Sequence, residues 1–128
     1  MNGFLWVFLG GGLGAAARHG VGSLSASLLG SRYPWGTFFI NVLGSLLIGI
    51  LAEWFALQSQ ASANLRLFLI TGILGGFTTF SAFSLEIGLL HERGATMAAI
   101  VYALLSVLCG VAAMFGGMYL VRQLSSQG

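Results

Sequence analysis

The sequence predicts an all-α integral membrane protein, and three observations lead to this fold class. Of the 128 residues, 57% are hydrophobic and only 6% are charged, whereas soluble domains carry about 25% charged residues. Glycine supplies 20 residues, against a usual share of ~7%, and glycine allows membrane helices to approach closely. Finally, the chain is divided into long apolar segments without the alternating strands of a membrane β-barrel.

Three polar stretches separate the apolar segments, at residues 31–34, 58–64 and 91–94. Pro34 suits the first turn of a new helix. Each apolar segment has at least the ~20 residues needed to cross ~30 Å of hydrocarbon. We therefore expect a single domain over residues 1–128 with four transmembrane helices, at about residues 4–29, 34–57, 65–90 and 95–124.

The first apolar segment has one alternative interpretation, a secretory signal. Residues 4–17 are apolar and end in small residues, as signals do. No basic side chain precedes this segment, however, and Arg18 follows the position where cleavage would occur. A first membrane helix is therefore the better interpretation.

The few charges give no preferred orientation in a membrane. Arg66 and Arg122 fall on the side of the two termini, and Arg32 and Arg93 fall on the opposite side, so the positive-inside rule does not decide. We expect insertion in both orientations and pairing of inverted copies into an antiparallel homodimer. The alternative is one topology fixed by the order of insertion. The net charge of +2 is too small and scattered for a nucleic-acid surface.

The stretch GGFTTFSAFS, residues 75–84, predicts a break in the third helix near the bilayer centre. Glycines weaken a helix, and non-helical backbone at that depth requires burial in protein or a polar path. Carbonyls freed by such a break commonly hold a sodium ion. The alternative is a continuous helix whose hydroxyls bond to carbonyls one turn back. The density of hydroxyl and phenyl groups favours the break: Thr78, Thr79, Ser81 and Ser84 accompany Phe77, Phe80 and Phe83.

Two stripes of small polar residues predict the wall of a pathway. The stripes recur at every fourth residue, as Thr37, Asn41 and Ser45 and as Tyr102, Ser106 and Gly110. An amide inside a membrane needs a partner, which a contact between helices without further function also supplies. Hydroxyl and amide donors together with phenylalanine ring edges favour a small anion. The chain has no lysine to hold an anion tightly, and conduction requires weak sites.

Ionisable residues inside membrane segments are candidates for function. Arg18 is the deepest cation, and it either snorkels or binds carbonyls of another helix. Glu86 lies two residues beyond Ser84, either at the interface or beside the pathway. Neither histidine is expected to have a functional role, and no nucleophile–base pair or metal-ligand set indicates an enzyme.

The stretch at residues 75–84 strongly resembles the central signature of the Fluc family of fluoride channels (CrcB-type), usually written GGFTTFSTFS. The resemblance covers nearly the whole chain, through Arg18, Asn41 within GTFFINVLGS, Tyr102 and Ser106. It implies a passive fluoride-specific channel, multi-pass in the bacterial plasma (inner) membrane, that lowers cytoplasmic fluoride. It also implies a dual-topology, antiparallel homodimer with two pores and one central sodium ion, which is structural and not transported.

The same resemblance assigns roles to residues. Gly75 and Thr78 would hold sodium through their backbone carbonyls, and Phe80 and Phe83 would line the pores with ring edges. The other pore residues would be Asn41, Tyr102 and Ser106, with Arg18, Thr37, Thr79, Ser81, Ser84 and Glu86 as further possibilities. Ala82 and Gly110 stand where many members have a hydroxyl residue, so this chain lacks two polar groups of the family pattern.

Two other classes of protein remain open. A small dual-topology multidrug or guanidinium exporter also has four spans, but it requires a carboxylate deep in the first helix, where this chain has Arg18. A structural membrane subunit without transport is the other alternative. Measurement of fluoride efflux from liposomes distinguishes these classes.

Overall fold

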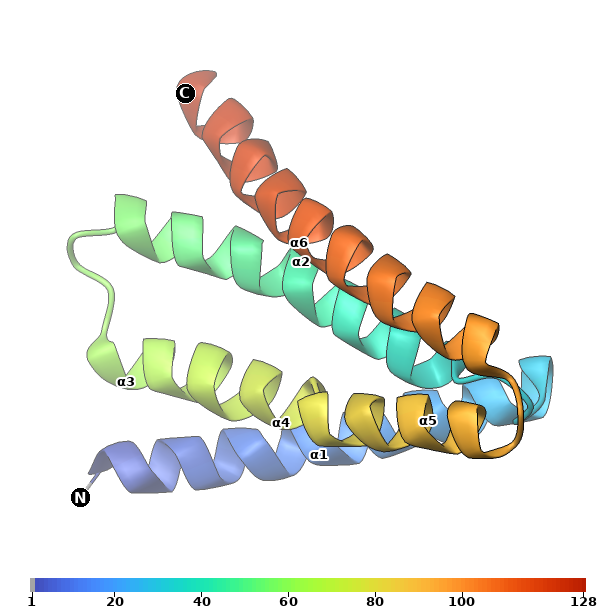
Figure 1. Cartoon of the computed structure of the whole chain (residues 1–128). Helices are drawn as coiled ribbons and strands as arrows, with labels where there is room; N and C mark the ends of the chain where they lie inside the picture. The colour runs from blue at the N-terminus through green and yellow to red at the C-terminus, as the bar shows by residue number, and fades with distance from the viewer. Residues whose placement is uncertain (1) are drawn as a thin grey trace.

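The structure is a computed structural model that describes residues 2–128 (Figure 1). These residues form helices and contain no strand, which confirms the all-helical class. The long helices are α1 (Asn2–Leu29), α2 (Trp35–Leu57) and α6 (Thr96–Ser126). Between α2 and α6, a third helical stretch is assembled from α3 (Ala63–Arg66), η1 (Leu67–Leu74), α4 (Gly75–Phe77) and α5 (Phe80–Glu92). The helix ends lie close to the boundaries expected from the polar stretches.

Three of these stretches are long and apolar enough to cross a membrane: Trp35–Leu57, Ala63–Glu92 and Thr96–Ser126. The chain is therefore a multi-pass membrane protein. Helix α1 is not among the three, although it has 28 residues. Glycines, Arg18 and His19 dilute the apolar character of α1.

The turns at one end of the molecule follow from local sequence. Gly30 and Gly94 adopt positive φ angles of 80° and 86°, directly after α1 and near the end of α5. The Ala95 N–H donates to the Leu90 carbonyl at 2.8 Å, the backbone closure typical of a glycine-terminated helix. Pro34 immediately precedes α2 instead of lying in its first turn, a shift within the usual uncertainty of helix ends.

The helices lie in two pairs (Figure 1). Helix α1 lies alongside η1 and α4, and α2 lies alongside α6. Both termini and the loop after α2 lie at one end of the molecule, and the two turns before α2 and α6 lie at the other. We call the second end the turn end. Helix α5 contacts α6, so the third helical stretch connects the two pairs.

Close backbone contacts hold each pair together. A Cβ atom on Gly14 would collide with the Ile73 carbonyl, and one on Gly117 would collide with the Leu46 carbonyl. Small residues permit this approach, which strengthens van der Waals packing where no hydrophobic effect drives membrane helices together. The high glycine content is therefore used at helix–helix contacts.

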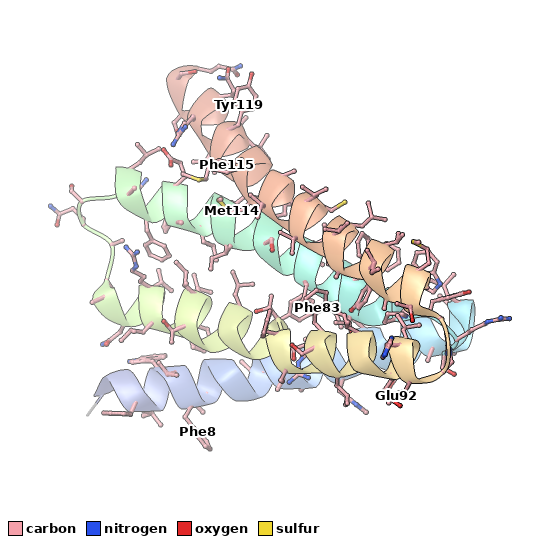
Figure 2. All side chains as sticks on the ribbon, in the orientation of Figure 1. Phe8, Phe83, Glu92, Met114, Phe115 and Tyr119 are labelled. Atoms are coloured by element: carbon pink, nitrogen blue, oxygen red, sulfur yellow. The ribbon has the colours of Figure 1, made fainter. Side chains whose placement is uncertain are left out.

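A small core lies between α5 and α6, and the outer faces are apolar. The core consists of Phe83, Leu90, Ala99 and Tyr102. Figure 2 shows Phe83 on the inner side of α5 and Phe8 projecting outward from α1, where 77% of Phe8 is exposed. Large exposed apolar surfaces of this kind indicate contact with lipid or with another protein.

Candidate ion site and polar pathway

Thr78 and Thr79 interrupt the third helical stretch. Their backbone angles are extended, with φ −85° and ψ 157° at Thr78 and φ −150° and ψ 119° at Thr79. The Thr78 hydroxyl donates to the Leu74 carbonyl at 2.8 Å. The Thr79 hydroxyl accepts from the Ala82 N–H at 3.1 Å and caps α5. The two hydroxyls thus satisfy backbone groups on opposite sides of the interruption.

Asn41 of α2 holds the interruption through both ends of its amide. Its Nδ2 donates to the Thr79 carbonyl at 3.0 Å, and its Oδ1 accepts from the Thr79 N–H at 2.9 Å. Extended backbone inside a helical protein lacks a neighbouring strand, and the Asn41 amide replaces that neighbour. The partner expected for Asn41 is therefore the backbone of the interruption.

Arg18 of α1 binds the backbone just before the interruption. Its Nε donates to the Gly76 carbonyl at 3.1 Å. Of the two arrangements expected for Arg18, the structure shows the one in which it binds a carbonyl of another helical segment. This bond connects residues that are 58 positions apart in the sequence.

The backbone carbonyls of Gly75 and Thr78 lack hydrogen-bond donors at the interruption. In a continuous helix they would accept from the N–H groups of Thr79 and Ala82, but these N–H groups donate to Asn41 and to the Thr79 hydroxyl. Within residues 2–128, neither carbonyl accepts a hydrogen bond. Such oxygens suit a hard cation.

The oxygens of one chain do not complete a cation site. Sodium would need more ligands than the carbonyls of Gly75 and Thr78, and residues 2–128 contain no cluster of three His, Cys, Asp or Glu side chains. Gly75 is exposed in the single chain. The site is therefore open to further ligands from outside the chain.

A polar cluster lies between the start of α2, α5 and α6. The Thr37 hydroxyl donates to Glu86 Oε1 at 2.6 Å. Tyr102 approaches both groups, but its hydroxyl is buried and makes no hydrogen bond within the described chain. Glu86 thus lies beside the polar stripe of α2, and its place beside a pathway stays a prediction.

The stripes of α2 and α6 face each other. The Ser106 hydroxyl is buried and, within residues 2–128, has no hydrogen-bond partner. A Cβ atom on Gly110 would lie 3.4 Å from the Ser45 hydroxyl. Ser45 itself donates to the Asn41 carbonyl at 2.7 Å. The two unpartnered hydroxyls of α6 therefore border the polar stripe of α2.

The structure places the two signature phenylalanines in different surroundings. Their ring centroids are 5.8 Å apart. Phe83 is only 8% exposed, and its centroid lies 5.2 Å from that of Tyr102 in an edge-on arrangement. Phe80 is 79% exposed, on the open side of the interruption. The sequence did not distinguish these two positions.

The remaining candidates lie at the edge of this region. Ser81 Oγ is 3.4 Å from the Thr79 hydroxyl, and Ser84 is exposed. Sequence reasoning missed Gly44, at which a Cβ atom would collide with the Thr78 methyl group. Its spacing of three residues from Asn41, which places both on one helix face, was the available signal.

Comparison with known proteins identifies the family. Residues 5–118 match the model of the CrcB-like protein family, described as Camphor Resistance (CrcB). A relative from Hyphomonas neptunium named fluoride-specific ion channel FluC is 54% identical over 97% of this chain and 98% of its own length. A relative of the same name from Rhodopseudomonas palustris (strain BisB5) is 52% identical over 95% of this chain and 98% of its own length. The resemblance seen in the signature is confirmed, and the chain belongs to the CrcB family.

Proposed function

We propose that the chain is a passive, fluoride-specific ion channel of the bacterial inner membrane. The observation that carries this proposal is the buried Ser106 hydroxyl on α6, which has no hydrogen-bond partner within residues 2–128. The Tyr102 hydroxyl, which lies near Thr37 and Glu86 but forms no hydrogen bond with them, is the second such group. Hydroxyl groups without partners are costly in a protein interior, and a small anion would supply the acceptor. The names of the relatives, fluoride-specific ion channel, indicate which anion.

In the proposed pore, the groups that contact the ion are weak hydrogen-bond donors and aromatic ring edges. The hydroxyls of Tyr102 and Ser106 donate to the ion, and ring edges of Phe80 and Phe83 face it with positive partial charge. Weak, multiple sites allow the ion to leave as readily as it enters. Hydrogen fluoride is a weak acid that crosses membranes and ionises inside the cell. A passive anion pathway therefore lowers cytoplasmic fluoride when the cytoplasm is electrically negative.

We further propose four spans and an antiparallel homodimer. Both termini lie at one end of the molecule (Figure 1), as an even number of crossings requires. The exposed positions of Gly75 and Phe80 support a partner that covers the interruption. In the single chain a Cβ atom on Gly75 meets only the Ile70 carbonyl, at an ordinary 3.7 Å. Gly75→Leu should therefore leave the chain folded but dissociate the dimer in a cross-linking assay; a stable Gly75→Leu dimer would refute this interface.

A structural sodium ion belongs to the same proposal. The carbonyls of Gly75 and Thr78 from one chain and the equivalent pair from its inverted copy would together hold the ion by oxygen ligands. The positive ion would offset the negative ends of these carbonyl dipoles where the two chains meet. The chain's own part is to free these carbonyls, which Asn41 and the Thr79 hydroxyl do by engaging the competing N–H groups.

The decisive experiment is ion efflux from proteoliposomes containing the purified protein. Fluoride should leave rapidly when a potassium ionophore clamps the membrane potential, and chloride should not. Ser106→Ala, which removes one unpartnered hydroxyl, should reduce fluoride efflux, whereas Ser27→Ala, which alters an exposed hydroxyl near the end of α1, should not. Equal efflux of chloride and fluoride, proton-coupled cation transport, or no transport would each reject the proposal.

A further inference from the structure

We propose that Arg32 and Arg93 form an anion-capture site at the turn end, at the mouth of a cavity that leads to Thr37 and Glu86. The inference rests on the proposed function, because it concerns how anions enter the channel. It assigns a role to residues outside the family signature. The ligand class is a small inorganic anion, bound weakly and briefly.

The two arginines are held together on a single aromatic ring. The guanidinium carbon of Arg93 lies 5.5 Å from the Tyr33 ring centroid, and that of Arg32 lies 5.8 Å from it. The Arg93 guanidinium also donates to the Arg32 carbonyl. Within residues 2–128, neither arginine forms an ion pair. Two cations on one ring repel each other, so an anion between them lowers their energy.

A cavity of about 490 Å³ begins at this pair. Arg32 lies in the turn before α2 and Arg93 follows α5, so both border the cavity at the turn end. Thr37 and Glu86 border the same cavity deeper along the helices. The arginine pair and the Thr37–Glu86 hydrogen bond therefore share one continuous space.

A second, separate cavity lies toward the helix interruption. It has a volume of about 390 Å³, it shares Thr37 with the first cavity, and its other lining residues include Arg18 and Thr79. Positive side chains thus border both cavities. Arg18 already donates its Nε to the Gly76 carbonyl, which leaves the mouth pair as the first cations that an entering anion meets.

The negative charge of Glu86 explains why positive charge is needed at the mouth of the cavity. A carboxylate in the wall repels an approaching anion, and cations at the mouth offset this repulsion. The opposite end of the chain lacks such an arrangement: Arg122 pairs with Glu53 at 3.0 Å, and Arg66 lies 6.0 Å from the Phe55 ring centroid. Charge at a cleft mouth raises the rate at which ions of opposite sign enter, and salt suppresses this gain.

The test measures fluoride efflux from liposomes of neutral lipid for the double variant Arg32→Gln/Arg93→Gln. At low ionic strength, about 10 mM, efflux should fall roughly two- to tenfold below wild type. At about 1 M sodium isethionate the Debye length is only ~3 Å, and the difference should disappear. Arg32→Lys/Arg93→Lys should retain most of the low-salt efflux because it keeps the charge. Arg66→Gln removes a cation away from the cavity and should have little effect.

Five outcomes would overturn the inference. Equal efflux of wild type and the glutamine variant at low salt would show that the charges do not capture anions. An equal deficit at all salt concentrations, or no recovery with lysine, would indicate a structural role for the guanidinium groups. A deficit confined to liposomes with anionic lipid would assign the arginines to lipid headgroups. Wild-type protein without fluoride efflux would reject the channel and the capture site together.

Discussion

The two halves of the third helical stretch are held by different kinds of contact. The first half, η1 and α4, lies against α1 with almost no side chain between the backbones. Cβ atoms on Gly10, Gly14 or Gly76 would collide with backbone of the facing segment. The second half, α5, lies against α6 through side chains, with Phe83 and Tyr102 at the centre of the contact.

We call η1 and α4 the rigid half, because backbone contact holds them against α1. The second half, α5, instead lies beside the unpartnered hydroxyl groups of α6. Backbone contact leaves no room for a ligand between α1 and the first half, and the Gly75 carbonyl at the end of this half is the group without a hydrogen bond in the described chain. Side-chain contact leaves the hydroxyls of Tyr102 and Ser106 buried without partners in the described chain. Asn41 fixes the junction of the two halves by its two hydrogen bonds to Thr79. The first half is thus anchored by backbone contact, and the unpartnered hydroxyls lie on the α6 side of the second half.

The largest effect is expected from a methyl group in the rigid half. Gly14→Ala places a Cβ atom into the Ile73 carbonyl, with backbone on both sides that cannot move aside. Overpacking of this kind should lower the free energy of unfolding by up to about 3 kcal/mol. The matched control is Gly12→Ala, because a Cβ atom on Gly12 meets nothing within 4 Å. Size-exclusion profiles and thermal midpoints in detergent would contradict the prediction if both variants behaved alike.

The next effect concerns the junction between the halves. Asn41→Leu keeps the side-chain volume but leaves both the N–H and the carbonyl of Thr79 without a partner. Unsatisfied buried groups cost about 1–3 kcal/mol, so the thermal midpoint should fall and fluoride efflux should be lost. Ser45→Ala removes a hydroxyl that bonds only within α2, and its midpoint should stay near wild type. A normal midpoint and normal efflux for Asn41→Leu would show that the extended backbone at Thr78 and Thr79 is stable without the Asn41 amide.

The rigid half also marks the limit of what the sequence could predict. Polar stretches predicted the helix ends, and the glycine and hydroxyl content of residues 75–84 predicted where the helical stretch changes. The π-helical turns of η1, in which the Gly75 N–H reaches the Ile70 carbonyl, were not predicted. These turns lie against α1, and no local sequence pattern indicated them.

Long-range partners were the other limit for the candidate site. The sequence required a partner for the Asn41 amide, but it did not show that the partner is the Thr79 backbone. The choice for Arg18 between snorkelling and a carbonyl was equally open, because the Gly76 carbonyl lies 58 positions away. The contrast between Phe80 and Phe83 depends on how α5 is rotated toward α6, which local pattern does not fix. The sodium ion and the dimer stay predictions.

The third prediction distinguishes two roles for phenylalanine side chains of α5: contact with the ion and packing in the core. Phe80→Leu should leave the free energy of unfolding within about 0.5 kcal/mol of wild type, because the ring is 79% exposed. It should nevertheless reduce fluoride efflux, because the ring edge is lost while the bulk remains. Phe83→Leu disturbs a packed core and should cost up to about 1.5 kcal/mol. Unchanged efflux in Phe80→Leu would reject the ring-edge account.

The smallest effect is expected at Thr78, where the proposed ligand is a backbone atom. Thr78→Ser keeps the carbonyl and the hydroxyl that donates to Leu74 at 2.8 Å, and it removes one methyl group, worth about 0.8 kcal/mol. Efflux in sodium should stay near wild type. Thr79→Pro, in contrast, removes the N–H that donates to Asn41 and cannot adopt φ −150°. It redirects the neighbouring carbonyl and should abolish both efflux and dimers. Retention of efflux and dimers in Thr79→Pro, or in wild type after replacement of sodium by N-methyl-glucamine, would remove the support for a structural cation.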